Sequence, residues 1–328
     1  MIFDFNDGWT LTKENGESFS VCLPHDAMLG EKRYASCRNA VQGGYFPGGK
    51  YRYTKTFQIN ESDIGKNIRL HFGGVYRNAV VSVNGEAVKE NKYGYSPFTA
   101  DLTEKITGGE NTVEVLADNS LVPNCRWYSG SGIYRPVYLE ISRKDAPTFL
   151  KIKTVGISPA VVEIDTDDGA QVQIFDAEGN LAASGQKGRF EISGAHLWSA
   201  EKPYLYTCKV SRGGEERTEK FGIRTLEWSG KTGLLVNGQE ILLRGGCIHH
   251  DNGVLGACSF ADAEERRVRI LKSQGFNALR MAHNPASRSL LDACDRIGMY
   301  VMDEAFDGWY IPKEYHDYSR DFLSDYKS

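Results

Sequence analysis

The chain has 328 residues, which is long for one ordinary domain and suits two or three. Apolar residues make up 41% and charged residues 25%, a composition typical of a globular protein rather than a disordered or fibrous one. The formal net charge is −4, and no block of like charge provides the basic stripe that binds nucleic acid or an anionic membrane. We therefore expect neither partner.

Targeting and redox signals point to the cytoplasm. No run of about eighteen apolar residues could span a membrane, and the N-terminus lacks the basic and apolar regions of a secretory signal. The seven cysteines are odd in number and scattered, and no Cys-x-x-Cys spacing occurs. Free thiols in a reducing cytosol are the simplest interpretation of this pattern.

Residues 1–142 read as an all-β domain. Apolar and polar side chains alternate over 51–59, which is the period of a half-buried strand. Further strands are predicted over 68–72, 79–83, 112–116 and 136–141. Asn84 and Gly85 predict a tight hairpin, because both residues tolerate positive φ. Many short strands at regular spacing favour a β-sandwich of jelly-roll type.

Residues 143–226 repeat this style on a smaller scale. Short strands are predicted over 161–164, 171–175, 181–183, 204–210 and 217–223. The segment has the size of a small immunoglobulin-like sandwich.

The pattern changes in residues 227–328, where strands and helices alternate. Strands are predicted over 240–244, 277–280 and 299–302. Asp262 is expected to cap a helix that runs to about residue 273, and a second helix over 287–297 is expected to end at Gly298. Such alternation with short loops indicates βαβ units on a parallel sheet.

Polar side chains follow each of these three strands. The first strand leads to His249, the second to Arg280, His283 and Asn284, and the third to Glu304. A lone histidine at a strand end is usually only hydrogen-bonded within the fold. Because three strand ends in register meet at one edge of a parallel sheet, we expect a functional site there.

Two other interpretations of these residues are weaker. Zinc could be bound by His249, His250, Asp251 and His283, but adjacent histidines point in different directions and the helical His-x-x-x-His spacing is absent. Asp303 and Glu304 are neighbours on a strand, so they face opposite sides and cannot flank one glycosidic bond as acid and nucleophile. We expect one at the edge and the other in the interior.

The first domain contains a segment with two open interpretations. Arg126, Trp127 and Tyr128 stand together ahead of a glycine-rich stretch. The aromatic rings could stack on sugar rings while the arginine donates to hydroxyl groups. Alternatively, Trp127 belongs to the sandwich core and the glycines only turn the chain.

Residues 277–285 read Asn-Ala-Leu-Arg-Met-Ala-His-Asn-Pro, and Leu290, Leu291, Asp295 and Gly298 follow. This segment resembles the first signature of glycoside hydrolase family 2, the family of β-galactosidases, β-glucuronidases and β-mannosidases. Further landmarks are similar, namely Pro24-His-Asp-Ala27, Gly132-Ile-Tyr-Arg-Pro136, Phe221-Gly-Ile-Arg224 and Leu243-Arg-Gly-Gly246. Covering nearly the whole chain, the resemblance implies a jelly-roll sugar-binding domain (1–142), an immunoglobulin-like sandwich (143–226) and the N-terminal part of a TIM barrel (227–328). Met281 and Asn284 are mild departures.

The resemblance also implies roles for individual residues. His249, Arg280 and His283 match family positions that line the sugar subsite, and Asn284 and Glu304 lie beside them.

Two further family positions differ in this chain. Arg126 falls where some β-galactosidases place a carboxylate that reaches the site from the first domain, so the residue's identity differs. The stretch 305–309 lacks the glutamate and histidine of the family's magnesium site, so no metal or cofactor is predicted.

A larger departure concerns the two catalytic glutamates. In the family, the acid/base glutamate follows the fourth barrel strand in an Asn-Glu pair, and the nucleophile follows the seventh. No Asn-Glu pair occurs after residue 227, and the 102 residues that remain after residue 226 of 328 are fewer than half of the roughly 250 in a barrel. We therefore expect that the chain stops at Ser328, in the helix after the third strand, and that both glutamates lie beyond Ser328.

Our leading hypothesis is that the chain is the N-terminal portion of a retaining β-glycosidase, most consistent with a β-galactosidase. We expect this portion to be inactive by itself. Alternatives are a β-glucuronidase or β-mannosidase relative, a non-catalytic carbohydrate-binding protein, or a fragment that associates with a missing barrel segment. The expected partner is a small sugar, and a homo-oligomer is also possible.

Overall fold

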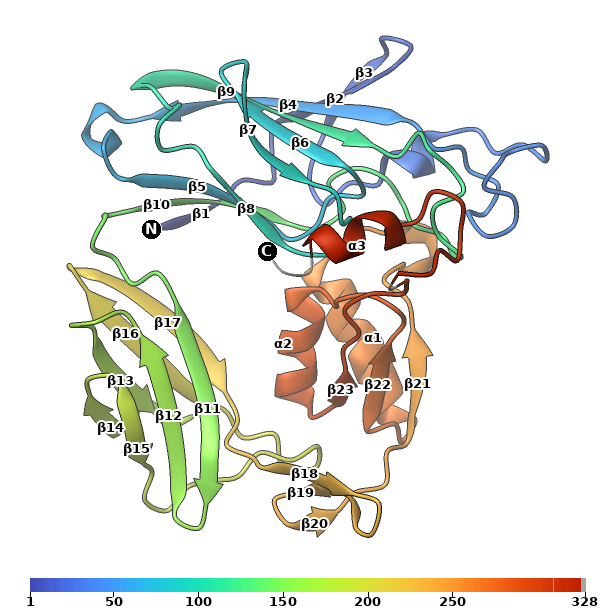
Figure 1. Cartoon of the computed structure of the whole chain (residues 1–328). Helices are drawn as coiled ribbons and strands as arrows, with labels where there is room; N and C mark the ends of the chain where they lie inside the picture. The colour runs from blue at the N-terminus through green and yellow to red at the C-terminus, as the bar shows by residue number, and fades with distance from the viewer. Residues whose placement is uncertain (309, 326–328) are drawn as a thin grey trace.

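The computed structural model describes residues 1–308 and 310–325. Two antiparallel β-sandwiches precede a three-stranded parallel sheet with helices, and the first sandwich lies across the other two units (Figure 1). This architecture confirms the predicted fold class, a jelly-roll sandwich, an immunoglobulin-like sandwich and the first βα units of a TIM barrel.

The first sandwich packs a four-stranded sheet, ordered β1-β10-β5-β8, against a six-stranded sheet, ordered β3-β2-β4-β9-β6-β7. The strands are β1 Ile2–Asp4, β2 Trp9–Lys13, β3 Ser18–Val21, β4 Lys50–Ile59, β5 Asn67–Phe72, β6 Ala79–Val83, β7 Glu86–Asn91, β8 Phe98–Asp101, β9 Gly109–Asp118 and β10 Val137–Ser142. Short 3-10 helices cover Ala27–Gly30 (η1) and Glu61–Asp63 (η2). The predicted alternation in β4 is confirmed, since Tyr51, Tyr53, Phe57 and Ile59 are buried in the core between the sheets.

The hairpin between β6 and β7 is also confirmed. Asn84 and Gly85 have φ angles of 51° and 84°, the left-handed values that a tight two-residue turn requires.

The second sandwich contains a three-stranded and a four-stranded sheet, ordered β11-β12-β15 and β14-β13-β16-β17. Its strands are β11 Leu150–Ile157, β12 Ala160–Thr166, β13 Gln171–Phe175, β14 Leu181–Gly185, β15 Gly188–Glu191, β16 Tyr206–Arg212 and β17 Glu215–Phe221. A small sheet, β18 Leu226–Ser229, β19 Gly233–Val236 and β20 Gln239–Glu240, leads to the next unit.

The barrel portion consists of three parallel strands and the helices between them. These elements are β21 Gly245–Ile248, η3 Gly253–Leu255, α1 Ala261–Ser273, β22 Ala278–Met281, α2 Arg288–Ile297, β23 Tyr300–Met302 and α3 Ser319–Asp325. The helix side chains Val268 and Leu290 pack on Leu279 and Met281, which cover one face of the sheet. No helix in the described ranges is long and apolar enough to cross a membrane.

A helix after the third strand was predicted to contain Ser328. The described helix in this position, α3, covers Ser319–Asp325. Ser328 itself lies outside the described residues, so this part of the prediction stays untested.

The first strand of the barrel portion lies later than predicted. The apolar run 240–244 was expected as this strand, but Glu240 pairs with Leu235 in an antiparallel hairpin, and the parallel strand is β21. Gly245 permits this pairing, because a Cβ atom there would lie 2.5 Å from the carbonyl oxygen of Ala278 on β22. Leu242 is not core; it is 75% exposed.

At the helix ends, the predicted cap of the first helix is wrong and the predicted end of the second helix is confirmed. Asp262 does not cap α1, since the cap position is Phe260 without a side-chain hydrogen bond, and Asp262 lies in the first turn. A carboxylate there still interacts favourably with the helix dipole. In α2, the Ser287 side chain accepts from the Leu290 N–H, and Gly298 ends the helix in the left-handed conformation, as predicted.

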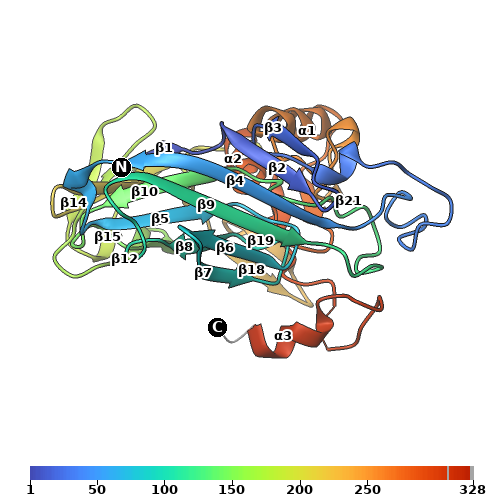
Figure 2. The ribbon, with the colours of Figure 1, turned by 90° about the horizontal axis from the view of Figure 1, so that it is seen from above.

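The segment after β23 returns to the first sandwich. Tyr93 donates a hydrogen bond to the Ala305 carbonyl (2.7 Å), and the guanidinium of Arg77 donates to the His316 carbonyl (2.9 Å). Seen from above, α3 lies on the opposite side of the molecule from α1 (Figure 2). The return places Ala305, Asp307 and Lys313 beside Arg280 and Glu304, at the carboxyl ends of the parallel strands.

Candidate functional site

Arg280 forms the centre of the site at the carboxyl edge of the sheet. The parallel register aligns it with Cys247 on β21 and Met302 on β23. Its Nε atom donates to Oε1 of Glu304 at 2.6 Å, and its Nη1 atom lies 3.5 Å from the sulfur of Cys247. The guanidinium is therefore held in place by groups from the other two strand ends.

Glu304 bridges Arg280 and His283. Its Oε2 atom accepts from Nδ1 of His283 at 2.6 Å. Burial alone would raise the pKa of Glu304, but the hydrogen bonds from His283 and Arg280 outweigh it and lower the pKa. Glu304 therefore remains a carboxylate, suited to accept hydrogen bonds and unsuited to act as a general acid.

Trp127 reaches this edge from the first domain. Its ring centroid lies 4.7 Å from that of His249 and 5.4 Å from that of His283. This position excludes the sandwich core, one of the two interpretations that the sequence left open. Tyr128 instead donates to the Asp26 carboxylate at 2.7 Å, so its hydroxyl is engaged within the fold.

His249 is held beside Trp127 as a neutral ring. Burial lowers its pKa and outweighs the nearby Asp251 carboxylate. The backbone at this point is fixed by Arg267, which donates to the His249 carbonyl at 2.9 Å.

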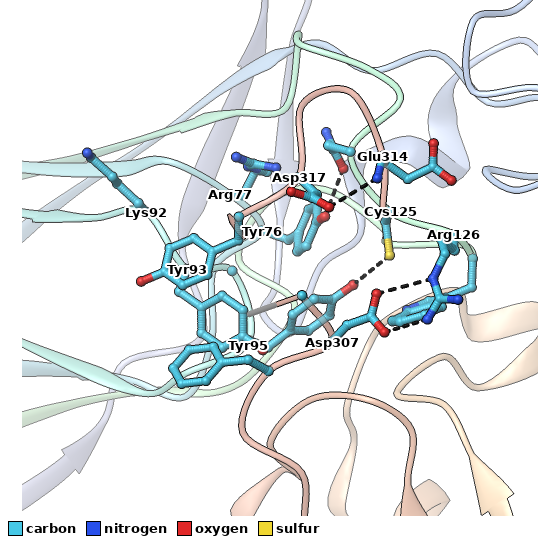
Figure 3. A pocket seen from close by; sticks show the side chains of 16 residues that line it. Tyr76, Arg77, Lys92, Tyr93, Tyr95, Cys125, Arg126, Asp307, Glu314 and Asp317 are labelled. Atoms are coloured by element: carbon cyan, nitrogen blue, oxygen red, sulfur yellow. Dashed lines mark hydrogen bonds and ion pairs between the residues drawn. The ribbon is translucent and has the colours of Figure 1, made fainter. Parts of the chain in front are cut away.

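Arg126 pairs with Asp307, a residue that the sequence analysis did not identify as functional. Nε of Arg126 donates to Oδ2 of Asp307 at 3.2 Å, and Nη2 donates to Oδ1 (Figure 3). Nζ of Lys313 lies 3.2 Å from the same Oδ1. The guanidinium also lies 5.5 Å from the Trp127 ring. The only signal for Asp307 was its place three residues after Glu304, in the same loop.

These side chains surround an open pocket of about 430 Å³. It is lined by Arg126, Arg280, His283, Asp303, Glu304, Ala305, Phe306, Asp307 and Lys313. On the far side of Arg126 a cavity of about 40 Å³ is walled by tyrosines, where Tyr95 contacts the sulfur of Cys125 at 3.3 Å (Figure 3). That cavity is too small for a sugar, so the open pocket is the candidate site.

The structure therefore gathers five of the six predicted site residues. Arg126, His249, Arg280, His283 and Glu304 lie around Trp127 and the pocket, whereas Asn284 is 1% exposed and does not line it. Asp303 and Glu304 follow β23 and both line the pocket, so the expectation that one of them lies in the interior is wrong. Their partners differ, since Asp303 accepts from the Ala286 N–H at 2.9 Å.

Within the described ranges, no three histidine, cysteine or acidic residues are arranged to hold a metal ion. All seven cysteines are free, as predicted.

Comparison with known proteins identifies the family of this chain. The family 2 sugar-binding domain matches residues 42–142, the general family 2 domain matches 148–224, and the family 2 TIM barrel domain matches 230–316. The chain belongs to glycoside hydrolase family 2. The family signature around residues 277–285 therefore marks the pocket edge of a family 2 barrel.

Relatives of this family 2 chain are considerably longer. A β-galactosidase of Bacteroides ovatus is 38% identical over 92% of this chain and 39% of its own length. A putative β-glucuronidase of Formosa agariphila is 32% identical over 95% of this chain and 34% of its own length. A family 2 structure from Bacteroides cellulosilyticus superposes with a TM-score of 0.90 at 33% identity, covering 99% of this chain and 48% of that one. The chain thus spans about two fifths of these curated relatives.

Proposed function

We propose that this family 2 chain is the N-terminal portion of a retaining β-galactosidase and contributes its sugar-binding pocket. The observation that carries the proposal is the Arg280–Glu304–His283 cluster, which opens into the pocket beside Trp127. The likeness to the Bacteroides ovatus β-galactosidase supports it.

In this proposal the pocket binds sugar hydroxyl groups through a fixed set of donors and acceptors. Arg280 donates, the Glu304 carboxylate accepts, and the hydrogen bond from Nδ1 to Glu304 fixes the orientation of the His283 ring. The half-buried Trp127 ring forms an apolar wall beside both histidines. Such groups orient a substrate without breaking its glycosidic bond.

Hydrolysis requires two further carboxylates, about 5–5.5 Å apart in a retaining enzyme. We propose that both glutamates lie beyond Ser328, outside this sequence, and that this chain alone does not hydrolyse glycosides. The edge of β23 would then pair with the strand that continues the barrel, supplied by the same chain or by an associated one. The coding DNA after the codon for Ser328 tests this, because an Asn-Glu pair after a fourth strand is expected there.

A galactoside is favoured over a glucuronide by the charges that line the pocket. Each cation of this pocket in the described chain already has a carboxylate partner: Arg126 and Lys313 share Asp307, and Arg280 has Glu304. A uronate is bound most strongly by a cation whose charge is not already neutralised by a carboxylate, and each of these three has such a partner. A neutral hexoside faces no such conflict.

A second candidate function is a carbohydrate-binding protein without catalysis, favoured by the open pocket alone. The seven free cysteines support a reducing compartment for either function.

Sugar titration and a turnover assay on the same preparation test the proposal. Methyl β-galactoside should change the fluorescence of Trp127 with saturation, and a chromogenic β-galactoside should not be hydrolysed above background. A Trp127→Phe variant identifies the responding tryptophan. Absence of binding would refute the pocket assignment, whereas turnover that disappears in a Glu304→Gln variant would show that the chain is catalytic by itself.

A further inference from the structure

A small, largely enclosed cavity lies between the first sandwich and the barrel portion, apart from the pocket. Arg135 enters it from the first domain, and His250, Ser259, Glu264 and Ser287 enter it from the barrel portion. Its volume is about 10 Å³. That is at the lower end of the roughly 10–15 Å³ that one buried water molecule needs.

Arg135 supplies one unpaired donor to this cavity. Its side chain is 2% exposed, and its two terminal nitrogens donate to the carbonyls of Tyr95 (2.8 Å) and Pro285 (2.7 Å). The Nε–H has no partner within the protein. A guanidinium N–H without a partner in such a buried place costs more than most unmade hydrogen bonds.

His250 supplies an unpaired acceptor. The ring is 6% exposed, and its Nε2 atom lies 2.9 Å from the carbonyl oxygen of Ser129, which can only accept. The hydrogen of a neutral ring must therefore be on Nε2, leaving the Nδ1 lone pair without a protein partner. Burial lowers the pKa of His250 to about 3, which agrees with a neutral ring.

Glu264 supplies a second acceptor. Its side chain is 3% exposed, and Oε1 accepts from the Ser259 hydroxyl at 2.9 Å. Oε2 has no hydrogen-bond partner, and the nearest cation, Arg267, lies 3.7 Å away.

We propose that one buried water molecule occupies this cavity, accepting from Nε of Arg135 and donating to Nδ1 of His250 and Oε2 of Glu264. One donor and two acceptors match the three hydrogen bonds that a buried water typically makes. A metal cation is disfavoured by the adjacent guanidinium groups of Arg135 and Arg267, and an anion by the Glu264 carboxylate.

This water links the first domain to the residues behind the pocket. Arg135 already holds the Pro285 carbonyl, two residues after His283, and His250 is the neighbour of His249. The junction therefore borders the backbone next to both histidines from outside the pocket. The inference does not depend on the substrate or on hydrolysis.

A high-resolution crystal structure of the 328-residue chain tests the proposal directly. We expect a density peak within hydrogen-bond distance of all three atoms, without the anomalous signal or short contacts of a metal. Clear density for the three side chains with no peak between them would overturn the proposal, as would an ion at that position.

A His250→Phe variant provides a second test, because it keeps an aromatic ring and removes both nitrogens, the Nδ1 acceptor and the Nε2 donor to the Ser129 carbonyl. We expect the peak to disappear and the Tm to fall by several degrees. His196→Phe is the control for the same change at an exposed histidine, whose ring lies 4.7 Å from that of Tyr204 in the second sandwich and does not line the cavity. An unchanged peak in the His250→Phe crystal would contradict the proposed hydrogen bond. If that variant does not fold, the density in the unmodified protein decides.

Discussion

Individual residues from two domains build the pocket, and the pairing of each charge determines what the pocket can bind. Arg126 would be a free cation if the first sandwich were isolated, but Asp307 from the barrel portion neutralises it. Glu304 would be an ordinary carboxylate, but Arg280 and His283 hold it ionised. Both pairs can be tested by removing one charge.

Asp307→Asn should shift the sugar preference of the pocket toward uronates. The change removes the carboxylate that Arg126 and Lys313 share, so both cations become available to the substrate. We expect affinity for methyl β-glucuronide to rise by about tenfold relative to methyl β-galactoside, about 1.4 kcal/mol. Fluorescence titration with both sugars measures it.

Asp101→Asn is the matched control, because Asp101 pairs with Arg69 on the first sandwich and lies outside the pocket. An equal shift in both variants, or none in Asp307→Asn, would refute charge pairing as the basis of selectivity.

Sugar binding should lose strength only in acid. Because the pKa of Glu304 lies below its ordinary value of 4.5, the carboxylate form is fully present above that value. Protonation begins only as the pH falls through the lowered pKa, and the acceptor is then lost. Affinity for the galactoside, measured by titration at a series of pH values, should therefore be constant from neutral pH down to about 5.

Glu304→Gln should weaken binding at every pH above the pKa of Glu304 and abolish the loss in acid. A decline centred near neutral pH in the unmodified chain would instead assign the dependence to a histidine.

At the scale of elements, the end of α2 joins the barrel portion to the second sandwich. Gly298 adopts φ 86°, and a Cβ atom there would lie 2.1 Å from the carbonyl oxygen of Ala200. Trp198 donates to the Asp295 carbonyl at 2.9 Å in the same contact. One glycine thus serves both as helix cap and as the site of close approach between two domains.

Gly298→Ala should lower the free energy of unfolding by more than the replacement of a left-handed glycine by alanine usually does. Left-handed backbone costs an alanine about 1 kcal/mol, and the clash with Ala200 adds to it. Gly275→Ala is a matched control, since Gly275 also has φ 86° but no atom within 4 Å of its added Cβ. Chemical denaturation measures both free energies of unfolding. Equal losses would show that the contact with the second sandwich contributes nothing.

At the scale of the whole molecule, the two sandwiches have closed cores, whereas the parallel sheet has an open edge at β23. Beside that edge lies a mostly apolar groove of about 740 Å³. Trp228, Leu243 and Met302 line it and are 79%, 42% and 57% exposed. Parallel sheets are normally covered on both faces, so this part of the molecule has the least complete packing.

The barrel portion, from about residue 227 onward, should therefore exchange amide hydrogens faster than both sandwiches. Hydrogen exchange with mass spectrometry, on protein shown to be monomeric by sedimentation, measures the difference. The same segment should be cut first in limited proteolysis. Protection of β23 equal to that of β4 and β16 in the monomer would mean that the three-stranded unit is stable by itself. Protection that appears only at high concentration would indicate self-association through the open edge.

Local sequence patterns determined the elements whose neighbours are close along the chain. The period of two in β4, the Asn84-Gly85 turn and the Gly298 helix end were all predicted, because backbone dihedral preferences and alternating burial act over a few residues. The position of Arg280 and His283 at the carboxyl edge was predicted from the alternation of strands and helices, which indicates a parallel sheet whose strands align their carboxyl ends.

Only the tertiary structure decided which distant residues meet. The start of β21 depends on how closely Gly245 approaches β22, and the partner of Arg126 lies 181 residues away at Asp307. Likewise, Trp127 contacts histidines more than a hundred residues later in the chain, and Asn284 is buried although its neighbours are not. Residue periodicity carries no information about such contacts, because they arise where separate domains pack and exclude water from the charges between them.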